Sequence, residues 1–496
     1  MRHGHAASPA SCRWPQPSYE ENALINPDAR KWRVEEVAIS GLFGRYNHRF
    51  TLDQDHRVTI LHGPNGVGKT AMLRLLYAIF AGRTFQLFAT KFAELYLSFD
   101  SGETVRIRRE SSVEDPTAEH IVVQSSDALG LETTSEAFVD AKVLTKFASS
   151  IARRLPWLER IDDEVWIDRR TAERLTTGEL LSKFDGSDPD LRPARIGIGE
   201  QIKPLLKLHG IVQELSRRVS VHIIETQRLL SKPRRGERRP YREEEEGDSE
   251  VRTTVLECAE ELKKRIAASL SRYATESQRR DQSFPFRLLN LAQQSRVDTA
   301  KLQRQLSDIG DKRRQLAEIG LLVDKTEPYA ESLERLDLAS ADDAQRRVIE
   351  LYAGDTAGKL AALDEVLQVA RLFFGVVNTR FRHKQLALDR ERGLIANTVE
   401  QDSIRLDALS SGEQHQLVLF FDLIFRVRPG SIVLIDEPEL SLHISWQKSM
   451  LDSLIEIAAA KSLDIVIATH SPYIVGSRVE LMRDLGSPDY SEDAFI

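Results

Sequence analysis

The chain of 496 residues is 41% hydrophobic and 29% charged, a composition that excludes a disordered or fibrous protein and fits roughly two to four packed domains. Its 69 basic and 76 acidic residues give a net charge of −7. The molecule as a whole is therefore not drawn to a polyanion, and any contact with nucleic acid must be local. The two cysteines, Cys12 and Cys258, exclude a disulfide framework and a cysteine zinc site, so we expect a reducing compartment, the cytoplasm.

Two further segments limit the class of protein. Residues 1–30 contain four prolines and no apolar core, which predicts a flexible N-terminal tail rather than a signal peptide. The longest strongly apolar stretch, 417–427, is interrupted by Asp422 and Arg426. It is too short for a membrane span, which needs about 18 residues, so no membrane is expected as a partner.

The first folded segment is expected over residues 31–230. Short runs at 32–40, 48–52 and 58–61 are bounded by Gly, Asn or Asp and predict strands, and a helix is predicted over 71–80. The turn Asp100-Ser101-Gly102 predicts a hairpin of 92–99 with 104–109, and 121–124 adds a strand. We expect residues 135–218 to be mostly helical and 219–225 to form another strand.

A charged loop and a helical insertion are expected next. Residues 231–250 carry a basic block and then an acidic block, and the acidic charges offset the basic ones. A flexible surface loop is therefore favoured over a nucleic-acid-binding segment. Residues 251–350 are rich in helix formers, and SFPFR at 283–287 is expected to divide them into two arms. Leu302, Ile309 and Leu316, interleaved with Leu306, Arg313 and Gly320, predict a short antiparallel coiled coil. An ordinary helical bundle is an equal alternative.

The last segment, 351–496, alternates helix and strand. The patterns predict a helix over 357–381, a strand pair around Leu386 and Leu394, and then helix 412–426, strand 431–435, helix 444–460 and strand 464–468. This alternation predicts an α/β fold with a parallel sheet. The sheet begun by the first segment is expected to be completed by this one.

One motif predicts a phosphate-binding loop. Residues 63–70 fit G-x-x-x-x-G-K-[ST] in full and follow a predicted strand. In such a loop the backbone N–H groups surround phosphate, the lysine reaches the β and γ phosphates, and the hydroxyl residue ligates Mg²⁺. ATP and Mg²⁺ are therefore the expected cofactors. The expected ATP-binding residues are Gly63, Pro64, Asn65, Gly66, Val67, Gly68, Lys69 and Thr70.

Two adjacent carboxylates follow a second buried strand. The apolar run 432–435 ends in Asp436-Glu437-Pro438, and the carboxyl ends of parallel strands are where open α/β sheets bind ligands. We expect Asp436 to hold the metal through water and Glu437 to orient or deprotonate the attacking water. The alternative, that these residues only cap a helix, is outweighed by the phosphate loop elsewhere in the chain.

The order of further motifs resembles the ABC-type ATPase heads of the RecF, SMC and OLD families. After the phosphate loop come Leu409-Ser410-Ser411-Gly412-Glu413, the strand ending in DEP, Leu440-Ser441-Leu442-His443, and Ile467-Ala468-Thr469-His470-Ser471-Pro472. The resemblance implies that Ser410, Ser411, Gly412 and Glu413 form a signature that contacts the nucleotide of a second subunit. It also implies that ATP is held between two heads of a homodimer. Ser411 stands where the family usually has glycine.

Other roles are implied by the same resemblance. Residues 439–443 are similar to the loop that crosses the dimer interface, and His470 to the catalytic histidine that senses the γ-phosphate. Gln86 is a candidate for a glutamine that ligates the metal, and Tyr46 for an adenine contact. Lys69, Glu437 and His470 form the expected catalytic set.

Within this superfamily the chain most resembles anti-phage defence ATPases such as PtuA of Septu and AriA of PARIS. The likeness lies in LSSGEQ, DEPELSLH, ATHSP and the segment Glu225-Thr226-Gln227-Arg228-Leu229. It implies a slow ATPase that regulates a separate effector, which we expect to be a nuclease, because the short stretch after His470 has no room for the Toprim domain of OLD proteins. A recombination or repair ATPase that binds DNA directly, and an ATP-gated scaffold, stay open as alternatives. The 300-residue interruption disfavours a transporter head.

Overall fold

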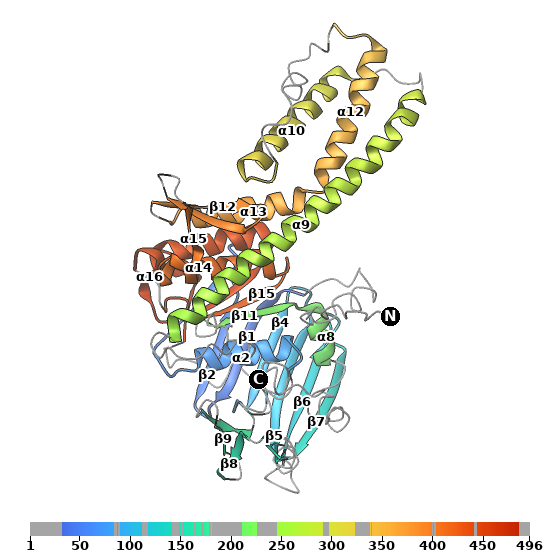
Figure 1. Cartoon of the computed structure of the whole chain (residues 1–496). Helices are drawn as coiled ribbons and strands as arrows, with labels where there is room; N and C mark the ends of the chain where they lie inside the picture. The colour runs from blue at the N-terminus through green and yellow to red at the C-terminus, as the bar shows by residue number, and fades with distance from the viewer. Residues whose placement is uncertain are drawn as a thin grey trace, which may run out of the picture.

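The computed structural model consists of an α/β head from which three long helices project (Figure 1). The structure describes residues 32–83, 87, 90–111, 118–140, most of 148–180 in short pieces, 211–225, 246–290, 297–322, 338, 340–381, 383–398, 400, 403–440 and 444–485. In this part of the chain, no helix is long and apolar enough to cross a membrane.

The parallel sheet of the head is built from both ends of the chain. Its strand order is β11–β15–β16–β3–β17, and every neighbouring pair is parallel. The bounds are β3 (Val58–His62), β11 (Val221–Glu225), β15 (Ile432–Asp436), β16 (Asp464–Thr469) and β17 (Met482–Asp484). The three inner strands are buried along nearly their whole length, as expected for apolar runs covered on both faces. The prediction that the last segment completes this sheet is confirmed.

Ion pairs at the amino-terminal edge of the sheet also join the two ends of the chain. The carboxylate of Asp464, at the start of β16, accepts from Arg33 Nη2 at 2.7 Å and from Arg57 Nη1 at 3.3 Å. Arg57 also donates to the Ser462 carbonyl oxygen at 3.1 Å. Because Asp464 is only 13% exposed, these bonds to two arginines compensate for its desolvation.

A second, antiparallel sheet covers the other side of the helix that follows β3. Its strand order is β2–β1–β4–β5–β6–β7. The bounds are β1 (Val34–Leu42), β2 (Tyr46–Thr51), β4 (Glu94–Phe99), β5 (Thr104–Ser111), β6 (Ala118–Ser126) and β7 (Glu132–Asp140). Strand β4 alternates between partly buried and buried positions, the pattern of a sheet with one face on a core. Helix α2 (Lys69–Phe80) and helix α8 (Ile211–Arg218) contribute to the same core as both sheets.

The expectation that residues 135–218 are mostly helical is wrong for much of the described part. Residues 132–140 form β7, which pairs with β6 along its whole length. A small antiparallel sheet follows, made of β8 (Leu158–Arg160), β9 (Val165–Asp168) and β10 (Glu173–Thr176). These short segments carry little periodicity of their own, so pairing with a neighbouring strand decides their conformation.

Helix α9 (Glu246–Leu289) begins the insertion and spans 44 residues. Its first residues, 246–250, lie inside the interval expected as a charged loop; residues 231–245 lie outside the described part. Acidic residues in the sequence favour a helix start, because the helix dipole has its positive end there. The expected break at 283–287 is also wrong, since Pro285 lies inside α9. Pro285 has no N–H to donate to the carbonyl one turn earlier, so the helix continues past it with one backbone hydrogen bond lost.

The antiparallel partner of α9 is α12 (Asp343–Ala361). Arg287 Nη2 donates to Asp355 Oδ2 at 2.7 Å, and farther back along α9 Asp281 pairs with Lys359 at 2.6 Å. The later residue of α9 thus pairs with the earlier residue of α12, so the two helices run in opposite directions. This confirms an antiparallel insertion. The helix expected over 357–381 is divided into α12 and α13 (Asp364–Asn378).

The predicted heptad seam lies on α10 (Thr299–Glu318) and divides between two cores. Leu302 and Leu306 are buried together with Ala353 of α12. Leu316, at the other end of α10, is buried in the main core of the head. The seam thus secures α10 both to α12 and to the head, an arrangement intermediate between a coiled coil and a helical bundle.

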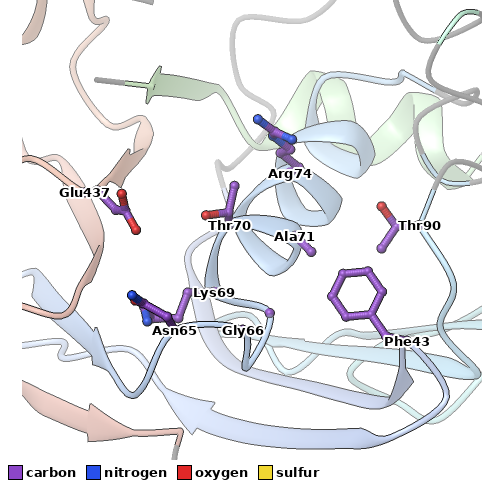
Figure 2. Close-up of a pocket in the computed structure, with 10 residues that line it drawn as sticks. Phe43, Asn65, Gly66, Lys69, Thr70, Ala71, Arg74, Thr90 and Glu437 are labelled. Carbon is purple, nitrogen blue, oxygen red and sulfur yellow. The ribbon is translucent and has the colours of Figure 1, made fainter. Parts of the chain in front are cut away.

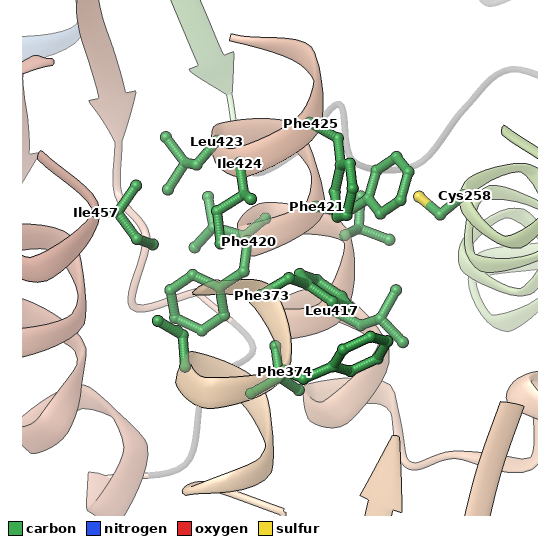
Figure 3. Close-up of a cluster of buried hydrophobic side chains, with 14 of the residues drawn as sticks. Cys258, Phe373, Phe374, Leu417, Phe420, Phe421, Leu423, Ile424, Phe425 and Ile457 are labelled. Carbon is green, nitrogen blue, oxygen red and sulfur yellow. The ribbon is translucent and has the colours of Figure 1, made fainter. Parts of the chain in front are cut away.

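The last segment places its remaining elements around one large core. These elements are β12 (Lys384–Asp389), β13 (Gly393–Thr398), β14 (Ser403–Ile404), η3 (Leu406–Ala408), α14 (Ser411–Phe421), the π-helical turn η4 (Asp422–Arg426), α15 (Ile444–Lys461), α16 (Pro472–Val475) and η5 (Val479–Leu481). Figure 3 shows the aromatic part of this core. Phe421 stacks on Phe425 with ring centroids 4.5 Å apart, and Phe373 meets both rings edge-on. Cys258 of α9 is buried in the same cluster, so the long helix is part of the head core.

Candidate functional site

The phosphate-loop motif lies between β3 and α2, as predicted. Gly66 and Gly68 adopt positive φ angles of 89° and 95°, a conformation that favours glycine. A β-carbon on Gly68 would lie 2.5 Å from Leu42 Cδ2. The glycines therefore allow both the backbone turn and its close packing on β1.

Lys69 is the first residue of α2 and is only 6% exposed. Its Nζ donates to the carbonyl oxygens of Gly63 at 2.7 Å and Pro64 at 3.0 Å. Burial lowers the pKa of Lys69, while the nearby carboxylates of Glu437, Glu439 and Asp436 oppose that shift. The ammonium group thus lies inside the loop, near the carboxylates that follow β15.

The next residue, Thr70, contacts the second predicted motif directly. Thr70 Oγ1 donates to Asp436 Oδ1 at 3.0 Å, although 366 residues separate them in sequence. Asp436 ends β15, whose neighbour β16 lies between it and β3. The sheet order therefore aligns the carboxyl end of β15 with the phosphate loop. A hydroxyl and a carboxylate oxygen are the donors that Mg²⁺ prefers, so these two residues fit the expected metal site. Gln86, the third candidate ligand, lies outside the described residues.

Glu437 and the loop line one pocket of about 400 Å³ (Figure 2). Glu437 has a φ of 46°, which lies in the left-handed region, so the strand conformation of β15 ends at this residue. The lining residues are Phe43, Asn65, Gly66, Gly68, Lys69, Thr70, Ala71, Arg74, Thr90 and Glu437. This set combines a phosphate loop, a cation and a carboxylate, the groups needed to hold a polyphosphate next to a base.

The aromatic residue at this pocket is Phe43 and not the expected Tyr46. Phe43 is 49% exposed and lies on the side of the pocket opposite Glu437 in Figure 2. The ring of Tyr46 instead stacks on His48, with centroids 6.0 Å apart. Both residues flank the same turn between β1 and β2, so the sequence indicated the segment but not the residue that faces the pocket.

His48 supports the phosphate loop from the antiparallel sheet. The residue is 3% exposed, and its Nε2 lies 2.8 Å from the carbonyl oxygen of Val67. Burial lowers the pKa of His48. Since a carbonyl can only accept, the neutral ring carries its hydrogen on Nε2. Sequence analysis did not identify this contact, and a histidine within a strand gave no signal of it.

His470 follows β16 and lies near two glutamates. Its Nδ1 is 3.2 Å from Glu439 Oε1 and 3.9 Å from Glu437 Oε1. The structure thus brings His470 to the carboxylates of the loop after β15. Glu439 belongs to the segment expected to cross a dimer interface, yet its side chain is only 5% exposed. Residues 441–443 of that segment lie outside the described part.

The signature residues begin helix α14. Ser410 is its N-cap: the Ser410 N–H donates to Glu413 Oε2 at 2.8 Å, and the Glu413 N–H donates back to Ser410 Oγ at 3.4 Å. Lys384 Nζ donates to Glu413 Oε2 at 2.8 Å. Burial alone would raise the pKa of Glu413, but the bonds from Lys384 and Ser410 outweigh it and hold that pKa below its usual range.

The same residues do not line the pocket of their own chain. Ser410 and Ser411 are exposed, and none of residues 410–413 is among the residues that line the phosphate-loop pocket. An exposed helix start of this kind presents backbone N–H groups to any anion that approaches.

Comparison with known proteins gives one family match. The family model described as AAA ATPase domain matches residues 34–475. No curated protein matches the chain. Among solved structures, it is similar to an SMC head domain with an extended coiled coil bound to the C-terminal domain of ScpA from Pyrococcus furiosus, at 14% identity and a TM-score of 0.31, covering 90% of this chain and 91% of that one. It is also similar to the SMC head domain from Thermotoga maritima, at 11% identity and a TM-score of 0.29, covering 91% and 94%.

Proposed function

The chain belongs to the AAA ATPase domain family, and from this premise we propose that it binds ATP with Mg²⁺ in the phosphate-loop pocket and hydrolyses it there. Lys69 and the loop N–H groups bind the phosphates, and Thr70 and Asp436 hold the metal. When bound, Mg²⁺ supplies charge neutralisation at the phosphates. Glu437 orients or deprotonates the attacking water.

One contact carries this proposal more than any other. Thr70 Oγ1 and Asp436 Oδ1 are 3.0 Å apart, so the hydroxyl after the phosphate loop and the carboxylate at the end of β15 face one position. Glu437, the neighbour of Asp436, lines the same pocket as Lys69. Phosphate binding, metal binding and a base therefore meet within a single pocket.

Steady-state hydrolysis and nucleotide binding test these roles together. Lys69→Ala is expected to lose ATP binding. Glu437→Gln is expected to retain binding while kcat falls by about 10² to 10⁴, the usual contribution of a proton-transfer residue. Glu480→Gln, at a glutamate that is 53% exposed, is the matched control and should behave as the wild type. Equal turnover by the wild type and Glu437→Gln would overturn the assignment of the base.

A second copy of the chain is proposed to complete the site. Ser410 and Ser411 of the signature are exposed, and none of residues 410–413 lines the pocket of its own chain, which is the arrangement needed if Ser410 and Gly412 contact ATP held by a partner. The α14 N-terminus would add a positive dipole end next to the γ-phosphate. ATP would then join two heads into a homodimer.

The cellular role proposed is regulation of a separate effector, a nuclease, in anti-phage defence. This proposal is supported by the likeness of LSSGEQ, DEPELSLH and ATHSP to defence ATPases. Co-expression with the product of the adjacent gene, followed by pull-down with ATP, with ADP and without nucleotide, tests it. Nucleotide-dependent association is the expected result. No association in any state, together with DNA binding whose log affinity falls linearly with log salt, would favour a DNA-binding ATPase instead.

A further inference from the structure

The carboxylate of Glu439 is buried at the point where two functional loops meet. It lies two residues after Glu437, in the turn that follows β15, and its side chain is 5% exposed. Burying a carboxylate is costly unless several donors satisfy it. Among the described residues, the donors reach only Oε1 of Glu439, and its buried Oε2 has no hydrogen-bond partner. The groups that contact Oε1 therefore indicate what the residue is for.

One oxygen of Glu439 makes three contacts to the segment after β16. Oε1 of Glu439 accepts from the Thr469 hydroxyl at 2.7 Å and from the backbone N–H of His470 at 3.0 Å. The same oxygen is 3.2 Å from Nδ1 of the His470 ring. Glu439 thus holds both the backbone and the side chain of His470.

A further hydrogen bond links the same contacts to Ser471. The hydroxyl of Thr469 accepts from the Ser471 N–H at 2.9 Å while it donates to Glu439. The three residues after the core of β16 are therefore positioned by one carboxylate from the loop after β15. A shift of that loop would move the histidine with it.

The short distance also bears on which nitrogen of the ring carries hydrogen. A carboxylate oxygen can only accept, so Glu439 Oε1 at 3.2 Å favours the ring with hydrogen on Nδ1, and in that neutral ring Nε2 is an acceptor. Glu437 Oε1 lies 3.9 Å from the same Nδ1. Both carboxylates thus face one edge of the ring, which leaves Nε2 on the opposite edge available for a substrate group or water.

We propose that Glu439 is the positioning residue of His470: it fixes the orientation and the tautomer of the imidazole beside Glu437. This inference rests on the proposed ATP hydrolysis, in which His470 takes part. Glu439 does not itself contact the reacting atoms, because its side chain is enclosed by the residues after β16. Its effect on the reaction passes through His470.

Two substitutions of similar size separate the charge of Glu439 from its ability to accept. Glu439→Gln keeps one acceptor oxygen, so kcat should fall about 10-fold, whereas Glu439→Met removes every acceptor and should lower kcat about 100-fold, at the low end for proton-transfer residues. In both variants the dissociation constant for ATP should change less than about 3-fold, since neither touches the phosphate loop. Melting temperatures check that each variant is folded.

A double-mutant cycle with His470→Ala identifies the route of the effect. If Glu439 acts through the imidazole, Glu439→Met should reduce kcat little further in a His470→Ala background. Additive losses would overturn the proposal, because they would mean that Glu439 acts independently of the ring. A wild-type rate in Glu439→Met would overturn it too.

A spectroscopic measurement keeps the test independent of turnover. In ¹⁵N-labelled protein, the His470 signal, assigned with His470→Ala, should show hydrogen on Nδ1 in the wild type and in Glu439→Gln. It should shift toward hydrogen on Nε2 in Glu439→Met. The same tautomer in all three proteins would contradict the inference. If the wild type shows the expected tautomer but no hydrolysis, the proposed function fails while the positioning contact stands.

Discussion

Arg426 and Glu261 join the end of the signature helix to the long helix of the insertion. Arg426 Nε donates to Glu261 Oε2 at 2.9 Å, and Arg426 also pairs with Asp422, one turn earlier. Arg426 ends the π-helical turn that continues α14, whose N-cap is Ser410. One continuous helical element therefore runs from the exposed signature to a contact with α9.

Replacing Arg426 by Met should destabilise the protein by about 2 kcal/mol, because it leaves the partly buried carboxylate of Asp422 without this cation and Glu261 with Arg265 alone. Burial raises the pKa of Asp422, and the Arg426 guanidinium opposes that shift. Methionine keeps the aliphatic packing over the Phe421 ring, which Arg426 covers at 5.3 Å. Chemical denaturation measures the loss.

Arg265→Met is the matched control for that variant. Arg265 pairs with the same Glu261 at 2.8 Å, but its side chain is 43% exposed. An exposed pair of this kind contributes about 0.2 to 1 kcal/mol, so the control should lose much less stability. Equal losses of unfolding free energy in the two variants would show that the ion pair of Arg426 with Glu261 contributes no more than an exposed ion pair does.

The ion pair of Glu413 with Lys384 predicts a pH dependence of stability. The pKa of Glu413 is lower in the folded protein than its ordinary value of 4.5, so the stabilisation is complete above pH 4.5 and is lost as the pH falls through the folded-state pKa. Glu413→Gln keeps a capping residue but not the charge. Near neutral pH the free energy of unfolding of the wild type should exceed that of Glu413→Gln by about 1 to 2 kcal/mol. This difference should shrink below pH 4.5. A constant difference would contradict this assignment.

The bond from His48 to the Val67 carbonyl predicts a role in nucleotide binding. Because a trans peptide is planar, fixing this carbonyl also fixes the Gly68 N–H, which points the opposite way. His48→Phe keeps a ring but removes the donor, and ATP binding measured by calorimetry should weaken about 5- to 10-fold. Tyr46→Leu removes the stacked ring and leaves the bond intact, so it should bind ATP within about 2-fold of wild type. The opposite order of effects would refute the role of His48.

A large cation at Ser410 should separate ATP binding from dimerisation. In a Glu437→Gln background with ATP, light scattering should report a dimer, whereas adding Ser410→Arg should leave a monomer that still binds ATP. The variant also loses the N-cap, at a cost of about 1 kcal/mol. Ser403→Arg, at another exposed serine, should remain dimeric. A Ser410→Arg dimer would rule out the signature as the dimer contact.

The sequence alone predicted the phosphate loop, the carboxylates after β15 and the composite sheet. Each depends on a local pattern: a loop motif with glycines at positive φ, or an apolar run of four residues that only a buried parallel strand accommodates. Thr70 and Asp436 could be paired because parallel strands bring their carboxyl ends to one edge.

The missed features depend on tertiary partners. Strand β7 takes its conformation from pairing with β6, and α9 continues past Pro285 with the loss of one backbone hydrogen bond. Whether Phe43 or Tyr46 faces the pocket depends on the path of the turn between β1 and β2. The inward orientation of Glu439 depends on donors from Thr469 and His470, which lie 30 and 31 residues away and leave no local pattern.

Calorimetric titration of ATP with and without Mg²⁺, comparing wild type with Asp436→Asn, tests the central claim most directly. If the two ends of the chain form one Mg·ATP site, Asp436→Asn should lose about 10- to 100-fold in affinity with Mg²⁺ and match the wild type in chelator. Asp484→Asn, at an exposed aspartate ending β17 of the same sheet, should bind as the wild type does. Tight Mg²⁺-dependent binding by Asp436→Asn, equal to that of the wild type, would contradict the composite site.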